Sequence, residues 1–184
     1  MDTQKILSDR NGIQFIKLDD NQYKVCFDLK HPSFDLTKLI NVDLFNLIYT
    51  LNPDIYENNH IERISDNEAF VIGVVRHFFE DIGFPQRYSY LHICRLSDEK
   101  PSIVRFNAQT IYSMRPDTIS SELELVSFDN LISTIEIVSV NHLRIVQDIY
   151  VNENVVISPM IEKFIGVILL KICNRIKLFI ENAS

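Results

Sequence analysis

The last part of the chain has a helical pattern of hydrophobic and polar positions. Isoleucines recur every three or four residues over residues 158–183, with polar residues between them. Ser158 can cap this helix, and Pro159 suits its first turn, where a missing N–H costs nothing. The segment predicts the longest helix of the chain, with an apolar stripe that must lie against a large surface. Its longest uninterrupted apolar run, residues 164–170, is far shorter than the ~20 residues of a membrane span.

Much of the preceding sequence alternates with a period of two, which is typical of half-buried strands. A hairpin is predicted over residues 13–18 and 23–29, and the polar residues 1–12 before it could be flexible. From residue 87 onward the pattern predicts an antiparallel meander with turns between its strands, the first turn at residues 98–101. The predicted strands of the meander cover residues 88–96, 102–112, 123–128, 132–140 and 143–151.

Two helices are predicted between the hairpin and the meander. Leucines at helical spacing indicate the first over residues 35–51. The second is predicted over residues 66–82, because Ser65 and Glu68 have the spacing of a capping box and Gly83 follows the last turn.

The order of elements therefore predicts an α+β fold: an N-terminal β-hairpin, two helices, an antiparallel meander of about five strands and a long C-terminal helix. This order is close to a helix-grip arrangement, in which a curved antiparallel sheet wraps one long terminal helix. The length of 184 residues predicts a single globular domain over residues 1–184. An analogy of fold does not by itself carry a function.

Composition and charge narrow the classes of function. The net charge of −7 disfavours nucleic-acid binding and docking on anionic membranes, which both depend on Lys and Arg. Isoleucine and asparagine are abundant while alanine and glycine are scarce, a bias produced by AT-rich codons and compatible with large DNA viruses, some bacteria and some protists. The polar start shows no signal peptide, so an intracellular protein of the cytoplasm or nucleus, not a secreted one, is expected.

No motif for a metal or a cofactor is found in the sequence. The three cysteines are far apart and lack zinc-site spacing, so we expect buried free thiols and no metal. Nucleotide-binding loops, a hydrolase nucleophile motif and a metalloprotease motif are also missing, so no cofactor and no enzymatic activity are expected.

A candidate pocket follows from matching the first two strands of the meander across their turn. The register that pairs their apolar positions gives one shared face, which carries Tyr88, Tyr90, His92 and Phe106. Such a face could be a ligand pocket under the long helix, lined by polar tips. It could also be a core face whose tyrosine and histidine tips reach partners at its edge.

A candidate interface follows from the last two strands. If Val140 lies opposite Leu143, the other face of this hairpin carries Ile135, Ile137 and Val146. Both faces would then be apolar, which predicts a sheet covered on both sides. The long helix can cover one face, and the other requires the two central helices or a second protein chain.

A pair of carboxylates is predicted between the third and fourth strands of the meander. A three-residue turn would place Glu124 directly opposite Glu136, which is unfavourable for like charges. Such a pair could bind a cation or a partner's basic side chain. It could equally lie on a solvated outer face.

These patterns favour a non-enzymatic protein that binds protein, as a structural or accessory subunit of a larger assembly, and the codon bias is compatible with a viral one. A protein partner or self-association is expected on this interpretation. The alternative is a carrier of a small apolar ligand with a helix-grip cavity. A third interpretation is an enzyme with an unrecognised site at His92, or at Glu124 and Glu136.

Overall fold

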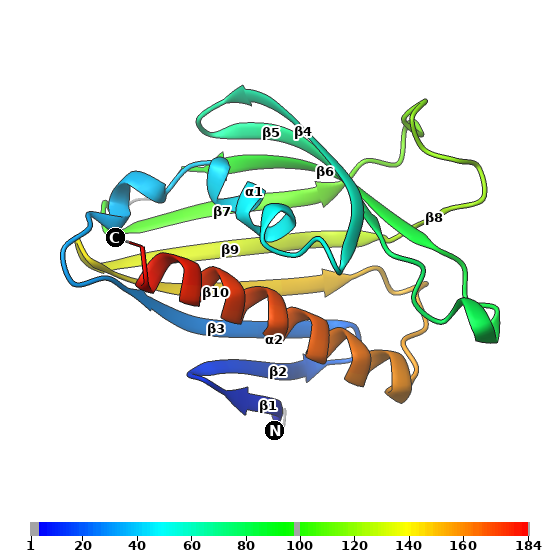
Figure 1. The fold of residues 1–184 in the computed structure, drawn as a ribbon, viewed down its shortest axis with the longest axis horizontal. Coiled ribbons are helices and arrows are strands. Elements are labelled where there is room, and N and C mark those ends of the chain that lie inside the picture. The colour runs from blue at the N-terminus through cyan, green and yellow to red at the C-terminus, as the bar shows by residue number, and fades with distance from the viewer. Residues whose placement is uncertain (1–3, 98–99, 184) are drawn as a thin grey trace.

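The computed structural model describes residues 4–97 and 100–183 as helices, strands and connections around one long sheet (Figure 1). Within this part of the chain, ten strands form the sheet in the spatial order β1-β2-β3-β10-β9-β7-β6-β5-β4, with β8 beside β6. The elements are β1 (Lys5–Arg10), β2 (Ile13–Asp19), β3 (Gln22–Lys30), η1 (Leu36–Leu39), α1 (Asp43–Thr50), β4 (Tyr56–Ser65), β5 (Glu68–Val75), η2 (Glu80–Ile82), β6 (Arg87–Leu96), β7 (Ile103–Thr110), β8 (Glu124–Leu125), β9 (Phe128–Ser139), β10 (His142–Val151) and α2 (Pro159–Glu181).

The sheet is curved, and both α-helices lie on the same face of it (Figure 1). Neighbouring strands are antiparallel except for β8, which is parallel to β6. Inward side chains of the strands and the buried stripe of α2 form one core cluster. This arrangement confirms an α+β fold with a helix-grip order, although the count of two central helices and about five meander strands is only partly right.

The predicted long helix is confirmed as α2. The side-chain oxygen of Ser158 accepts a hydrogen bond from the N–H of Ile161 at 3.4 Å, which caps the first turn. Ile172, Ile176 and Ile180 are buried on the side of α2 that faces the core. Gly166 lets the helix approach the sheet closely, because a β-carbon there would lie 3.0 Å from the ring of Phe15.

The N-terminal hairpin is also confirmed, as β2 and β3, and an unpredicted strand, β1, precedes it. Strand β3 alternates strictly between half-buried and buried residues, and its turn to β2 places Asn21 at a φ of 60°. Residues 5–10 form β1, an edge strand that pairs with β2. Residues 1–3 of the segment expected to be flexible lie outside the described residues, as do residues 98 and 99 of the predicted turn.

The second predicted helix is wrong, because residues 66–82 form strand β5 and, at their end, only the three-residue 3-10 helix η2. The residues that resemble a capping box form the turn of the β4–β5 hairpin, where the hydroxyl of Ser65 accepts from the N–H of Asn67 at 3.1 Å. Strand β5 is buried on both faces: Val71 packs in the main core and Val74 in a second cluster behind the sheet. A strand buried on both faces is a continuous apolar run, which also matches helical spacing.

The first predicted helix, residues 35–51, is present only in part, as the short helix η1 followed by α1. Four strands of the meander lie close to their predicted positions, whereas the strand predicted over residues 123–128 is only the two-residue strand β8. All three predicted registers of the meander are wrong. His92 pairs with Gln109 instead of lying opposite Phe106. Leu143 pairs with Ile137, because the β9–β10 hairpin has a register shift just after its turn.

Candidate ligand-binding groove

The four residues of the predicted pocket lie on opposite faces of the sheet. Phe106 is inside the core, where its ring meets the ring of Phe45 from α1 at 5.4 Å between centroids. Tyr88, Tyr90 and His92 lie on the outer face instead, because the pairing of β6 with β7 differs from the predicted one by three residues. An odd shift in register moves every side chain to the other face. These residues therefore do not line one cavity.

The outer-face residues of β6 have structural partners. Tyr88 is buried beneath the loop of residues 111–127, and the guanidinium of Arg115 lies 5.4 Å from its ring centroid. The Nε2 atom of His92 lies 2.8 Å from the Glu68 carboxylate, and its ring stacks on Phe70. The imidazole of His92 therefore has a polar partner without a ligand.

The two candidate glutamates are separated. Glu124 lies in β8, 3.8 Å from the guanidinium of Arg87. Glu136 lies in β9, 3.4 Å from Arg144. The prediction that they face each other is wrong, because β8 pairs with β6 and not with β9.

The candidate interface residues do not share a face either. Ile135 is only 1% exposed and Ile137 packs against the same core, so both are covered within the chain. Val146 lies on the opposite face, where its register partners are Thr134 and Cys26. The corrected register gives this hairpin one apolar and one mixed face.

The structure instead reveals a groove between the segment of residues 31–47 and the C-terminal end of α2. Its volume is about 550 Å³, within the ~300–1,000 Å³ range of small-molecule sites. Apolar side chains form most of its lining, with a few polar groups: Phe34, Leu39, Leu44, Leu47, Phe179, Ile180 and Ala183, together with His31, Ser33, Lys38, Asn41 and Asp43. This combination of an apolar body and a few polar groups suits a ligand that is largely apolar.

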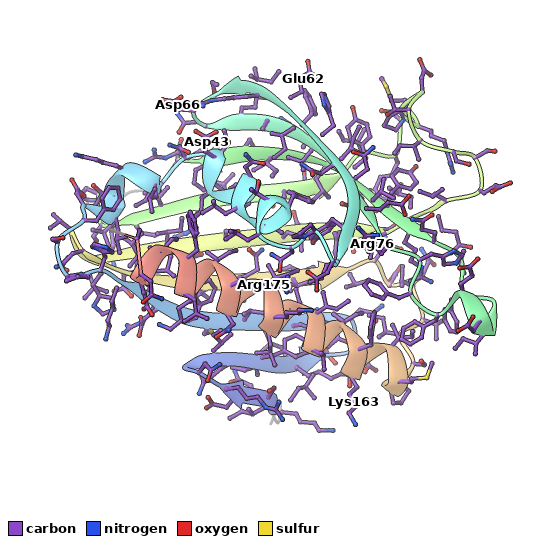
Figure 2. The ribbon with its side chains drawn as sticks, viewed as in Figure 1. Asp43, Glu62, Asp66, Arg76, Lys163 and Arg175 are labelled. Atoms are coloured by element: carbon purple, nitrogen blue, oxygen red, sulfur yellow. The ribbon has the colours of Figure 1, made fainter. Side chains whose placement is uncertain are left out.

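One wall of the groove, α1, is held in place at its N-terminal end. The Arg63 guanidinium of β4 binds the carboxylate of Asp43 at 2.9 Å and also that of Asp66 in the β4–β5 turn. Figure 2 shows Asp43 and Asp66 close together above α1. The position of this wall is therefore tied to the far edge of the sheet.

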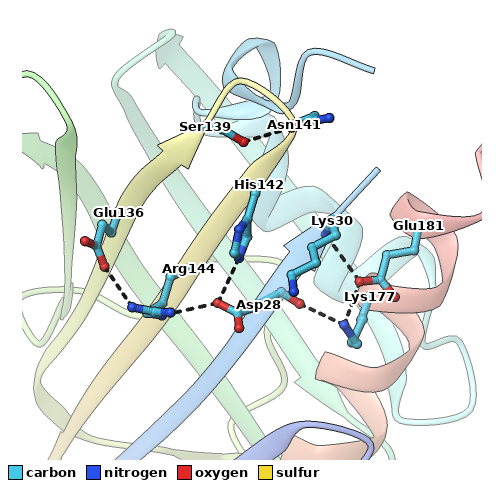
Figure 3. A network of polar contacts seen from close by, with 9 residues as sticks. All are labelled: Asp28, Lys30, Glu136, Ser139, Asn141, His142, Arg144, Lys177 and Glu181. Carbon is cyan, nitrogen blue, oxygen red and sulfur yellow. Dashed lines mark hydrogen bonds and ion pairs between the residues drawn. The ribbon is translucent and has the colours of Figure 1, made fainter. Parts of the chain in front are cut away.

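The other wall, the end of α2, is pinned to β3 by polar contacts (Figure 3). The ammonium of Lys177 donates to the backbone carbonyl of Asp28 at 2.9 Å and to Glu181 at 2.6 Å. Glu181 also accepts from the backbone N–H of Lys30 at 3.2 Å.

On the outer face of the sheet, the Asp28 carboxylate lies 3.2 Å from Arg144. Burial opposes its ionisation, but the contacts with His142 and Arg144 hold the pKa of Asp28 below its usual range.

The middle of α2 is fixed by a polar clamp around Asp54, which follows α1. Arg175 donates to the Oδ1 atom of Asn52 at 3.0 Å and also binds Asp54, while Lys171 binds Asp54 as well. Figure 2 shows Arg175 on α2 beside this segment. Hydrogen bonds from Arg175 and then Lys171 hold the pKa of Asp54 far below its usual range. The clamp therefore ties the segment that follows α1 to the middle of α2.

Over residues 4–97 and 100–183, no three His, Cys, Asp or Glu are placed to hold a metal ion. Burial raises the pKa of Cys173 to about 12, and burial also raises the pKa of Cys26, as in unreactive thiols. No described helix has the length and apolar character needed to cross a membrane.

Sequence reasoning missed the groove because its two walls come from distant segments. The leucines of residues 36–47 signalled a helix with an apolar side, and Phe179 belonged to the stripe of the last helix. No local pattern shows that these surfaces meet. The exposure of Phe34 and Phe179, 41% and 52%, becomes informative only once the fold places them beside one groove.

Comparisons with known proteins agree on the fold. No protein-family model and no curated protein matches the sequence. Solved structures match it over nearly its whole length. The lipid transfer and protein localization domain of human StarD13 (DLC2) has a TM-score of 0.69 at 12% identity, over 100% of this chain and 91% of that chain. A STAR-related lipid transfer protein from Xanthomonas axonopodis has a TM-score of 0.67 at 9% identity, over 97% of this chain and 99% of that one. Human StAR-related lipid transfer protein 5 has a TM-score of 0.65 at 9% identity, over 96% and 86%.

These similarities establish the helix-grip fold of StAR-related lipid transfer domains, and at such low identity they establish the fold alone. They also correct the interpretation as a viral structural or accessory subunit: these solved structures that share the fold are described by lipid transfer, and none of them is described as a viral protein or a structural subunit. The three proteins named above are described by lipid transfer and not by catalysis, in agreement with the expectation of a non-enzymatic protein.

Proposed function

We propose that this chain is a non-enzymatic carrier of a small apolar ligand, a lipid, held in the groove between residues 31–47 and the end of α2. The observation that carries this proposal is the apolar groove itself, in a fold whose solved examples are described as lipid transfer proteins. This was the alternative interpretation of the sequence. The expected protein partner, the single domain over residues 1–184 and the intracellular location stay predictions.

The lining of the groove suggests how a lipid would bind. Leu44 and Leu47 of α1 line the groove together with Phe179 and Ile180 of α2. A hydrocarbon chain bound between these two walls would lose its contact with water on both sides. Each buried methylene group contributes about 0.8 kcal/mol. Lys38, on the polar rim, is suited to a polar or anionic headgroup. No bond of the ligand needs to change, so the groove requires no catalytic residues.

Native mass spectrometry after mild purification tests this proposal. Wild-type protein should retain an added mass that dissociates as a lipid. Leu44→Trp should lose it, because the larger ring fills the groove. Asn46→Trp is the matched control, since it places the same side chain at an exposed position of α1 outside the groove lining. Equal lipid retention in both variants, or an empty wild-type protein after incubation with cell lipids, would contradict the proposal.

A further inference from the structure

His31, in the groove wall just after β3, joins the two walls through both nitrogens of its ring. The residue is 8% exposed. Its Nε2 atom lies 2.7 Å from the backbone carbonyl of Ala183, at the end of α2. Its Nδ1 atom accepts from the backbone N–H groups of Phe34 at 2.7 Å and Ser33 at 3.2 Å.

These contacts determine the tautomer of the ring. Two N–H donors point at Nδ1, so Nδ1 carries no hydrogen. A carbonyl oxygen only accepts, so the hydrogen is on Nε2 and is donated to Ala183. His31 therefore uses its neutral form to tie Phe34 and Ala183 together.

Protonation is incompatible with this arrangement. The imidazolium carries a hydrogen on both nitrogens, so Nδ1 would become a donor facing the N–H groups of Ser33 and Phe34. Both accepted hydrogen bonds would be lost at once. Phe34 lines the groove and packs edge-on against the His31 ring at 5.9 Å, so the release of its backbone frees a groove-lining side chain.

The charged groups around His31 come from every neighbouring element. Lys30 precedes it in β3, and Lys38 of η1 and Asp43 of α1 line the same groove. On α2, Glu181 is bound by Lys177. Strand β10 contributes a second imidazole, His142, which lies 3.3 Å from the carboxylate of Asp28 and faces away from the groove. The effect of His31 must therefore be distinguished from any effect of His142, which a His142 variant tests.

We propose that His31 is a pH-responsive latch of the groove. The neutral ring closes the end of the groove by joining residues 33 and 34 to Ala183, which follows α2, and protonation opens it. This inference rests on the proposed carrier function for its consequence, which is that protonation of His31 at lower pH releases a bound lipid.

Amide hydrogen exchange, followed by NMR on ligand-free protein, tests the latch without any lipid. After correction for intrinsic exchange, protection of the Phe34 amide should fall about three- to tenfold between pH values of about 7.5 and 5.5, the loss expected for one hydrogen bond. His31→Asn retains an acceptor near the Nδ1 position, so it should keep the protection at both pH values. His31→Ala should lack it at both, and the control His142→Asn should behave like wild type.

The latch is overturned if Phe34 protection in wild type does not change with pH, or if His31→Asn shows the same change. Lipid retention measured by native mass spectrometry at the same two pH values then tests the consequence. Retention should drop at the lower pH in wild type and stay level in His31→Asn. If the protein never retains lipid but the protection of the Phe34 amide falls with pH as described, the carrier function is refuted and the proposed role of His31 is supported.

Discussion

Tyr49 of α1 occupies the space that a side chain at Gly73 of β5 would need. A β-carbon at Gly73 would lie 2.5 Å from Cε1 of Tyr49, far inside normal contact distance. Tyr49 is 7% exposed, and its ring also packs against Tyr56 at 4.6 Å between centroids. The glycine thus allows α1, one wall of the groove, to lie directly on the sheet.

We expect Gly73→Ala to lower the free energy of unfolding by about 1–3 kcal/mol, since the added methyl group forces Tyr49 to move. Urea denaturation measures this loss. The same substitution should cost less in a Tyr49→Leu background, where the ring is absent. A Gly73→Ala protein as stable as wild type would contradict the packing described for α1.

The clamp on α2 gives a second prediction. Arg175→Met removes the donor to Oδ1 of Asn52, a residue that is 0% exposed, so a buried acceptor loses a partner at a cost of about 1–3 kcal/mol. Lys171→Met is the matched control, because Lys171 contacts the exposed Asp54 and should matter much less. Thermal unfolding of both variants checks this difference, and equal losses would refute the importance of the Asn52 contact.

A third prediction concerns the pH dependence of stability at the start of α2. Burial opposes ionisation of Glu162, but hydrogen bonds from Lys17 and Tyr23, both 2.9 Å long, hold its pKa below its ordinary value of 4.5. A pKa lower in the folded than in the unfolded state gives stability that is fully present above pH 4.5 and is lost as the pH falls through the folded pKa. Glu162→Gln should therefore show a weaker loss of stability below pH 4.5 than wild type in urea titrations. Parallel pH profiles would count against this ion pair.

The parts of the fold that were predictable have local signals. The cap at Ser158 and the isoleucine spacing predict α2, and strict alternation predicts β3 and most of the meander. Strand β5 was mistaken for a helix because it is covered on both faces, a tertiary property that removes the alternation. Registers failed for a related reason: one shift after the turn at residues 140–141 moves Ile135 and Ile137 to the inner face.

The site was harder to predict than the fold. Tyr88 and His92 were predicted to line a pocket because they carry polar groups among apolar residues. An odd shift in the pairing of β6 with β7 places them on the outer face of the sheet instead. Residues of the groove, such as Leu44 and Phe179, are ordinary apolar positions in sequence. What makes them a candidate site is that segments more than a hundred residues apart meet there, and no local pattern contains that information.

The chain contains no tryptophan, so single-tryptophan variants can report directly on the groove. Phe179→Trp places the reporter in the groove lining, and Tyr112→Trp places it at a comparably exposed aromatic position elsewhere, at 59% against 52% exposure. Both variants would be titrated with a fatty acid, a phosphatidylcholine and a sterol while tryptophan emission is followed. If the groove carries a lipid, at least one of these ligands will cause a saturable emission shift in Phe179→Trp and none in Tyr112→Trp. Unchanged emission of Phe179→Trp with all three, or equal shifts in both variants, would contradict the account.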